Sequence, residues 1–257
     1  MKPIETLSLM AAYTHTVSKE LTGMPGSNAE SAFTYVPTVN GPNNIGLHNS
    51  EYVTPDRFVA SATHSDKHGN HLSVIYEAWR GGYNYSYMMA NDMNGDGYNY
   101  DALYIPTDAE VENGLFRFVS ESDKTRFMDY VHNNDYLKDH QGEYAEAYSV
   151  YSPWVHRVDL SYKHDFKVNV GKTTHKLQLS CDIKNVLNLF NSEWGVSKVM
   201  NSTLNSGRIL KFEGTDAQGY PTFSTPSAVN ADTKTWIRNH AIGQCWYASV
   251  GIKYIFN

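Results

Sequence analysis

The feature that most constrains this chain is the alternation of apolar and polar residues at every second position. Successive side chains of a β-strand point to opposite faces, so this period predicts strands with one apolar and one polar face. In one clear example, Leu177, Leu179 and Ile183 alternate with Lys176 and Asp182. The pattern recurs in six segments, which cover residues 7–18, 56–64, 71–87, 157–163, 176–184 and 246–256.

The connections between the six segments alternate in length. Two are short turns, residues 66–70 and 167–173, whereas the other three contain the long segments 21–55, 91–152 and 201–242. Loops longer than about 15 residues are uncommon in compact soluble domains. Short turns at one end and long loops at the other are typical of antiparallel outer-membrane barrels. The spacing therefore predicts an all-β, antiparallel transmembrane β-barrel segment of about six strands.

Helical periodicity is confined to one place in the sequence. Over residues 122–137, Phe127, Tyr130 and Val131 share one helical face, and Ser122 is the expected N-cap. We expect this helix to lie within the loop 91–152.

The composition excludes several classes of protein. A net charge of −6 argues against a nucleic-acid partner, which requires a basic surface. With 41% hydrophobic and 19% charged residues, the chain is not expected to be disordered. No apolar run reaches the roughly 18 residues of a membrane helix. The two cysteines, Cys181 and Cys245, are expected on opposite faces of neighbouring strands and therefore free.

The apolar strand faces require either a second sheet, as in a soluble sandwich, or lipid. Lipid is favoured because the opposite faces carry ionic residues and because Trp246 stands at one end of the last apolar face, with Tyr254 and Phe256 at the other. The ten residue steps from Trp246 to Phe256 span about 27 Å after tilt, close to the apolar band of an outer-membrane barrel. We therefore expect these three residues to form a C-terminal barrel-assembly strand in the cell outer membrane.

Six strands are fewer than the roughly eight of the smallest single-chain barrels, and strands in lipid must close. The first residues also lack the apolar run and cleavage site of a signal peptide, which an outer-membrane protein needs for export. We therefore expect residues 1–257 to be the C-terminal part of a larger barrel. The alternatives are an autonomous small barrel or adhesin with two further strands in its loops, and a soluble extracellular glycan-binding β-sandwich.

Three motifs give the chain a family resemblance. The segment 153–160 (PWVHRVDL), the segment 182–191 (DIKNVLNLFN) and the ending 251–257 (GIKYIFN) resemble the late barrel strands of TonB-dependent outer-membrane receptors. The segments 7–23, 55–61 and 94–97 are similar to the Bacteroidetes-type branch with an N-terminal carboxypeptidase-regulatory-like domain. In that family the N-V-x-N-L-F motif lies on a strand.

The resemblance implies a barrel of about 22 strands that imports a scarce extracellular ligand. TonB, energised by the inner membrane, would act on an N-terminal plug domain that this sequence lacks. The six strands would be the last of the barrel, with turns 66–70 and 167–173 in the periplasm and the long loops outside. Implied partners are outer-membrane lipid, the TonB system, the barrel-assembly machinery and an unidentified extracellular ligand.

A calcium site is predicted in the 92–103 loop. Asp92, Asn94 and Asp96, with the carbonyl of Tyr98, follow the spacing of the first half of an EF-hand-type loop. The twelfth position is Leu103 rather than glutamate, so a closing carboxylate would come from Asp101, Asp108 or Glu110. The alternative is a simple turn at a loop tip.

A Tyr-rich stretch is the candidate ligand-binding segment. Trp79, Tyr83, Tyr85 and Tyr87 lead from the third strand into a long loop and could stack against a sugar or peptide, or form an interfacial aromatic girdle. His64, His68 and His71 surround one turn and are expected to be solvated rather than to bind zinc. No nucleophile–base pair stands out, so no catalytic residue is predicted and the chain is not expected to be an enzyme.

Overall fold

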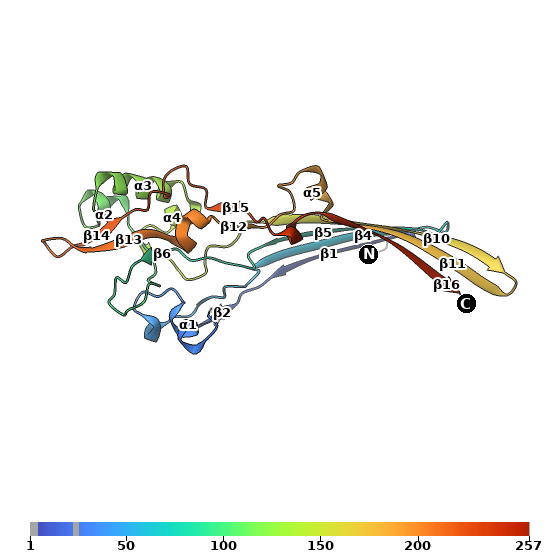
Figure 1. Ribbon diagram of the computed structural model, residues 1–257, viewed down its shortest axis with the longest axis horizontal. Coiled ribbons are helices and arrows are strands. Elements are labelled where there is room, and N and C mark those ends of the chain that lie inside the picture. The colour runs from blue at the N-terminus through green and yellow to red at the C-terminus, as the bar shows by residue number, and fades with distance from the viewer. Residues whose placement is uncertain (1–4, 23–25, 257) are drawn as a thin grey trace.

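The computed structural model describes residues 5–22 and 26–256. It consists of a long six-stranded antiparallel sheet, here called the blade, and a group of loops, short helices and small sheets at one end, here called the head (Figure 1). The head comprises residues 16–55, 81–154 and 197–241 within the described part of the chain. Strands account for 42% and helices for 18% of the structure, which confirms the mostly β, antiparallel character predicted from the sequence.

All six predicted strands are present and adjacent in the blade. Their order is β1-β4-β5-β10-β11-β16, so each strand pairs with its neighbours among the six in chain order. Their bounds are β1 Leu7–His15, β4 Asp56–Ser65, β5 Asn70–Arg80, β10 Val155–Val170, β11 Thr173–Lys184 and β16 Tyr247–Phe256. Lengths range from 9 residues in β1 to 16 in β10, and transmembrane β-strands need about 9–11.

The register places the apolar positions of all six strands on one face. Across the sheet, Leu9 pairs with Ala62, Ala62 with Val74, and Val74 with Leu160. Leu160 in turn pairs with Ile183, which pairs with Ala248. A one-residue slip in any strand would move its apolar side chains to the other face, so this register is fixed by the hydrophobic pattern.

The opposite face is polar and carries cross-strand ion pairs. The pairs, with their nitrogen–oxygen distances, are Arg57–Glu77 at 2.5 Å, Lys176–Asp165 at 2.6 Å and Lys184–Asp159 at 2.8 Å. Each joins adjacent strands, the geometry in which opposite charges stabilise an antiparallel pair. The predicted division into an apolar and an ionic face is therefore confirmed.

Two tight turns close the end of the blade far from the head. At the first, Gly69 has a φ of +88°, and a Cβ there would lie 2.6 Å from the carbonyl oxygen of Asp165. Only glycine fits such a backbone and such a close approach. The second turn is shorter than the predicted 167–173, because β10 continues to Val170 and residues 171–172 alone make the reversal.

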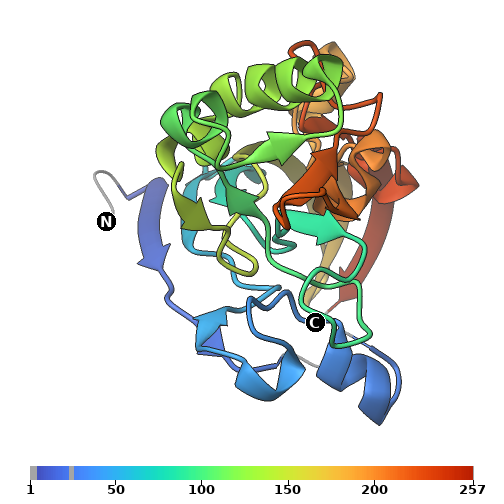
Figure 2. The ribbon, with the colours of Figure 1, turned by 90° about the vertical axis from the view of Figure 1, so that its left-hand side faces the viewer.

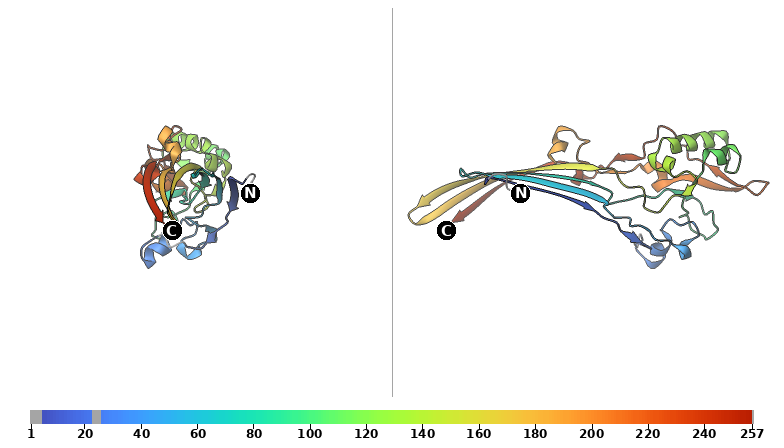
Figure 3. Two further views of the ribbon diagram at one scale, coloured as in Figure 1. Left: turned by 90° about the vertical axis from the view of Figure 1, so that its right-hand side faces the viewer. Right: turned by 180° about the vertical axis from the view of Figure 1, so that it is seen from behind.

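The long connections all emerge at the other end, as predicted, and fold together into the head (Figure 1 and Figure 3). Its strands are β2 Lys19–Glu20, β3 His48–Asn49, β6 Met88–Ala90, β7 Tyr104–Ile105, β8 Arg117–Phe118, β9 Glu143–Tyr144, β12 Lys198–Met200, β13 Arg208–Thr215, β14 Pro221–Ser224 and β15 Trp236–Arg238. Its helices are α1 Ala29–Thr34, α2 Asp108–Glu112, α3 Glu121–His132 and α4 Asp135–Asp139, with the 3₁₀ turns η1 Pro42–Asn44 and η2 Ser202–Gly207. Helix α5 (Val186–Phe190) and η3 (Ile242–Gln244) lie where the head joins the blade. The sheet β6-β13-β14-β8 includes two parallel pairs, which the antiparallel prediction did not anticipate.

The predicted helix at 122–137 is two helices with different ends. Helix α3 begins two residues earlier than an N-cap at Ser122 implies, because Ser120 rather than Ser122 accepts the hydrogen bond from the backbone N–H of Asp123, at 3.1 Å. The chain then leaves the helix at Asn133, and Asn134 caps the separate helix α4. The predicted buried face of Phe127, Tyr130 and Val131 is confirmed, but three further short helices of the described chain were not predicted.

Two expected strand segments leave the sheet. Residues 83–87 are not part of β5, because Gly81 and Gly82, with φ of +77° and +88°, turn the chain into the head. The N-V-x-N-L-F motif, expected on a strand, instead forms α5 after β11 ends. Asn185 begins that departure with a φ of +53° and a buried side chain that donates to the carbonyls of Gly195 and Gln244.

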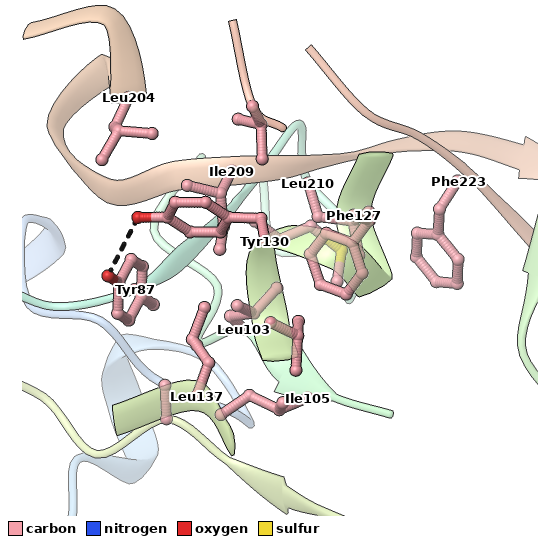
Figure 4. Packing of buried hydrophobic residues seen from close by; sticks show 14 of the residues in the cluster. Tyr87, Leu103, Ile105, Phe127, Tyr130, Leu137, Leu204, Ile209, Leu210 and Phe223 are labelled. Carbon is pink, nitrogen blue, oxygen red and sulfur yellow. Dashed lines mark hydrogen bonds between the residues drawn. The ribbon is translucent and has the colours of Figure 1, made fainter. Parts of the chain in front are cut away.

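The hydrophobic core lies in the head and not in the blade. Leu103, Phe127 and Tyr130 are at most 2% exposed, and Tyr87 and Tyr130 meet through their hydroxyls at 3.2 Å (Figure 4). In the blade, Ala78 and Val155, which are 3% and 4% exposed, are the only buried apolar residues among those described. The blade therefore does not obtain its stability from a core of its own.

The blade is open. Viewed along its length, β1 and β16 stand on opposite sides of the molecule (Figure 2), and in residues 5–22 and 26–256 no sheet closes on itself. Residues 1–4, where no signal peptide is predicted, and Asn257, the last residue of the predicted terminal-strand motif, lie outside the described residues. Within the described chain, none of the helices is both long and apolar enough to cross a membrane.

Candidate functional site

Three of the four predicted ligand-binding residues meet at one cleft. Trp79, Tyr83 and Tyr85 line a cavity of about 610 Å³ at the junction of blade and head, here called the junction cleft. Arg157 and Gln244 line it as well, although they come from other elements of the chain. Its size falls within the range of about 300–1,000 Å³ that is usual for small-molecule sites.

The blade supplies a rigid side of the junction cleft. Trp79 lies in β5 on the polar face, because it pairs with Arg57 on one side and Val155 on the other. The guanidinium of Arg157 lies 5.3 Å from the centroid of the Trp79 ring, within cation–π range. The same guanidinium donates to the carbonyl of Gly195 at 2.9 Å and to Oε1 of Gln244 at 2.7 Å.

The tyrosines on the opposite side are held by backbone hydrogen bonds between distant segments. Tyr85 exchanges two 3.0 Å hydrogen bonds with Val150, and the N–H of Gly82 donates to Val53 at 2.9 Å. The rings of Tyr83 and Tyr85 then meet edge to face, with centroids 5.1 Å apart. A planar or apolar part of a ligand could stack against this surface.

Tyr87 belongs to the core and not to the cleft. Its side chain is 0% exposed, and its hydroxyl contacts Tyr130 and accepts a hydrogen bond from Asn134 at 2.8 Å. In an extended strand, Tyr83, Tyr85 and Tyr87 would all lie on one face. The sequence pattern therefore could not show that Tyr87 is buried while Tyr83 and Tyr85 line the cleft. We therefore leave Tyr87 out of the candidate site.

A smaller cavity of about 220 Å³ adjoins the junction cleft and shares Tyr83 and Tyr85 with it. We call it the side pocket, and its polar lining includes Glu51, Asn84 and Arg208. Burial raises the pKa of Glu51, and burial together with the nearby Glu51 carboxylate raises the pKa of Tyr83 to about 12. The Tyr83 hydroxyl therefore stays protonated and can donate a hydrogen bond at neutral pH.

The predicted calcium loop is folded on its own side chains. Oδ1 of Asp92 accepts from the N–H of Gly95 at 2.7 Å and its Oδ2 from Gly97 at 2.8 Å, while Oδ1 of Asp96 accepts from Tyr98 at 2.8 Å. Asp101 faces the same loop, since its carboxylate accepts from the N–H of Met93 at 2.7 Å and the amide of Asn94 at 2.8 Å. Leu103, at the twelfth position, is fully buried in the core.

The loop brings carboxylates close together but does not arrange them as the ligands of a metal ion. Burial raises the pKa of Asp101 to about 6, and the carboxylates of Asp96 and Asp92 contribute to that rise. Among the described residues, no group of three or more His, Cys, Asp or Glu is arranged to hold a metal ion. Calcium at Asp92, Asn94, Asp96, Tyr98 and Asp101 stays a prediction.

The remaining predicted residues take the positions that the register implies. His64 pairs with Leu72 and His71 with Ser65, so these histidines point to opposite faces as expected. Cys181 pairs with Val250 on the apolar face, Cys245 lines a hollow on the polar face, and both are free.

The terminal aromatic residues stand at the two ends of one exposed face. Trp246, just before β16, lies at the head end, and Tyr254 and Phe256 lie near the far end. This is the arrangement that the sequence predicted for them, while their part in barrel assembly stays a prediction.

Several residues of the two cavities were missed by sequence reasoning. Glu51, Asn84, Arg157, Arg208 and Gln244 come from three different long connections or their borders and share no local motif. The one signal in the sequence was a pair of consecutive glycines, Gly81 and Gly82, directly before the Tyr-rich stretch. Such a pair marks a sharp change of direction, and the structure has one there.

Compared with protein-family models, with curated protein sequences and with solved structures, the chain matches none.

Proposed function

We propose that this chain forms part of the barrel wall and the extracellular ligand-binding head of a TonB-dependent outer-membrane receptor that takes up a ligand actively. The blade would face lipid with one side and the barrel interior with the other. The head would capture the ligand in the junction cleft. The proposal assigns binding and transport, not catalysis, to the chain.

The observation that carries the proposal is a large apolar face with no covering layer. On β16, Val250 is 79% exposed, Ile252 73% and Phe256 68%. Soluble monomers rarely expose contiguous apolar patches above about 300–600 Å², and such faces mark contact with membranes or partners. The polar face behind it carries three cross-strand ion pairs, which suits a water-filled interior.

The distribution of aromatic residues on the apolar face supports lipid as its solvent. Tyr13, Phe58 and Tyr76 gather near the head, and Phe58 and Tyr76 have ring centroids 5.9 Å apart. Tyr254 and Phe256 lie near the turns, with aliphatic side chains between the two groups. Barrels in the outer membrane have such aromatic girdles at both interfaces of an apolar band.

The soluble sandwich is the weaker alternative. A sandwich buries one face of each sheet against the other at a spacing of about 10 Å. In the described residues no second sheet lies over the apolar face, since the five sheets are the blade and four smaller ones that belong to the head. An autonomous small barrel would require two further strands to close the blade between β1 and β16, and in the described residues the blade has six strands with these two as its open edges.

The open edges are consistent with a place in a larger barrel. Unpaired N–H and C=O groups of an edge strand cost several kcal/mol each in hydrocarbon, so β1 and β16 would pair with further strands. The plug that contacts TonB would be a separate region. The aromatic face of β16 would serve the barrel-assembly machinery.

The proposal is tested by measuring the polarity around alternate positions of β16 in bilayers. Ser249→Cys and Val250→Cys are made in a background with Cys181→Ser and Cys245→Ser and are labelled with a polarity-sensitive fluorophore. At position 250 we expect blue-shifted emission that is reduced by quenchers attached to the lipids. At position 249 we expect the emission of a fluorophore in water. Equal emission at the two positions would remove the basis of the proposal.

A further inference from the structure

The side pocket contains a buried carboxylate without a cationic partner. Glu51 is 8% exposed, and none of the ion pairs in the described chain involves it. A second carboxylate is close, because Oε1 of Glu20 accepts the backbone N–H of Glu51 at 3.3 Å. The hydroxyls of Tyr83 and Tyr52 hydrogen-bond to the carboxylate of Glu51, but no cation of the described chain neutralises it. A buried charge is costly unless it is paired, so the site favours a positive group from elsewhere.

Asn84 forms a fixed part of the wall of the same pocket. Asn84 is 1% exposed, and its amide nitrogen donates to the carbonyls of Ser50 and Val53. Those bonds fix the side chain, yet its oxygen, Oδ1, is buried without a hydrogen bond. Buried acceptors almost always have a donor. This oxygen has essentially no accessible surface, however, so a ligand in the pocket does not contact it, and Asn84 contributes a fixed part of the wall.

The other walls are aromatic. Tyr83, Tyr100 and Tyr148 line the pocket, and Tyr35 stacks on Tyr100 with ring centroids 4.8 Å apart. The faces of tyrosine rings attract cations within about 6 Å. A buried carboxylate without an ion pair beside aromatic faces favours an organic cation over a metal ion, since calcium, for example, prefers a shell of six or more oxygens.

Arg208, the cation of this pocket, does not neutralise Glu51. Its guanidinium donates to the carbonyl of Asn99 at 3.0 Å and lies 4.6 Å from the centroid of the Tyr100 ring. It thus closes the wall formed by Tyr100 and leaves the carboxylate of Glu51 without an ion pair.

We propose that the side pocket binds a primary organic ammonium group, with the carboxylate of Glu51 as its acceptor and the tyrosine rings around it. The rest of the ligand extends past Tyr83 and Tyr85 into the junction cleft. This inference deepens the proposed function, because it gives the chemical class of the captured ligand.

Binding of butylammonium chloride to the full chain in detergent micelles tests the inference, with 1-butanol as the neutral probe of similar size. We expect butylammonium to bind at least about tenfold more tightly than 1-butanol, equivalent to about 1.4 kcal/mol. Glu51→Gln keeps the shape and removes the charge, so it should lose that preference. Glu112→Gln, an exposed carboxylate of α2 outside both cavities, should keep it.

Folding is checked independently of binding. Glu51→Gln removes a buried charge that has no ion pair, so it should retain the circular dichroism of the unaltered chain and should not lower its urea midpoint. Tyr100→Leu should weaken butylammonium binding through loss of its ring while leaving 1-butanol binding unchanged. Equal affinity for the two probes, or unchanged affinity in Glu51→Gln, overturns the inference.

The micelle experiment is separate from the bilayer experiment on β16. A water-like environment at position 250 would refute the membrane assignment and leave ammonium binding intact. Absence of ammonium binding would refute the side-pocket assignment and leave the barrel wall intact.

Discussion

The head and the blade place their apolar side chains in opposite ways. The head excludes water around a core in which Leu103, Phe127 and Tyr130 are almost fully buried. The blade repeats apolar side chains over six strands and leaves nearly all of them partly or fully exposed. One region is stable because it turns its apolar residues inward, whereas the other requires an apolar solvent outside.

The head and the blade also differ in how their charged residues are paired. In the blade, charges pair across neighbouring strands on the polar face. In the head they cap helices and join segments that are distant in sequence, as Asp123 does with Thr225. A substitution should therefore have a different cost in each region, and in the blade that cost should depend on the surrounding solvent.

The largest effect is expected from emptying the core of the head. Phe127→Ala should cost about 3–5 kcal/mol of unfolding free energy, because it leaves a cavity in a packed site. Urea unfolding followed by near-ultraviolet circular dichroism measures it. The matched change on the blade, Phe256→Ala, should cost less than about 1 kcal/mol in aqueous detergent. Equal costs would contradict the contrast between the regions.

The next largest effect on stability is expected from a charge placed on the apolar face of the blade, when stability is measured in bilayers. Leu179→Arg should cost about 2–4 kcal/mol if the residue lies at the bilayer midplane. Gln178→Arg, its neighbour on the polar face, should be close to neutral. Folding titrations in lipid vesicles compare the two. A neutral Leu179→Arg would show that the apolar face has been assigned to the wrong solvent.

A third prediction concerns the pH dependence of the head. Burial alone would raise the pKa of Asp123, but hydrogen bonds from Ser120, Thr225 and Arg126 outweigh it and lower that pKa below its ordinary value. A carboxyl with a lowered folded-state pKa stabilises the fold above its unfolded pKa and loses that contribution as the pH falls. Asp123→Asn should therefore cost about 1.5–3 kcal/mol at pH 7 and almost nothing near pH 2.

The control for the pH dependence is on the same helix. Asp129→Asn changes an exposed carboxylate of α3 and should shift the unfolding free energy by less than about 0.5 kcal/mol at either pH. A constant cost of Asp123→Asn across this pH range would mean that its charge is not what the hydrogen bonds stabilise.

The smallest effect is expected from calcium in the 92–103 loop. At ten times its dissociation constant, bound calcium should stabilise the loop by about 1.4 kcal/mol and slow proteolysis there about tenfold. Asp92→Ala and Asp96→Ala should abolish the protection, while Asp232→Ala, on a different exposed loop, should retain it. Unchanged protease sensitivity on adding calcium would refute the calcium prediction.

Much of the blade was predictable because its information is local. Alternation fixed which side chains of each strand share a face, and the lengths of the connections indicated which strands are joined by tight turns. Errors occurred at the borders, where Gly81 and Asn185 take left-handed backbone conformations that end the alternation. There the pattern of hydrophobicity continues for several residues after the strand has ended.

The head was predictable only in part. Phe127, Tyr130 and Val131 were recognised as a buried helical face, whereas Tyr87 was taken for a surface ring because its neighbours alternate with polar residues. Its burial depends on α3 and α4 folding over it, which no local pattern encodes. The side pocket has the same origin, since Glu51, Asn84 and Arg208 are distant in sequence.

The sequence by itself determined the two-faced strands, their order of tight and long connections, and the aromatic residues at the ends of the last apolar face. These features follow from the period of two and from turn chemistry, which act over a few residues. Only the tertiary structure decided that the long connections fold into one head with its own core and that Trp79, Tyr83 and Tyr85 line a common cleft. Such features depend on contacts between distant segments, whose geometry is set by packing and by backbone hydrogen bonds rather than by any local repeat.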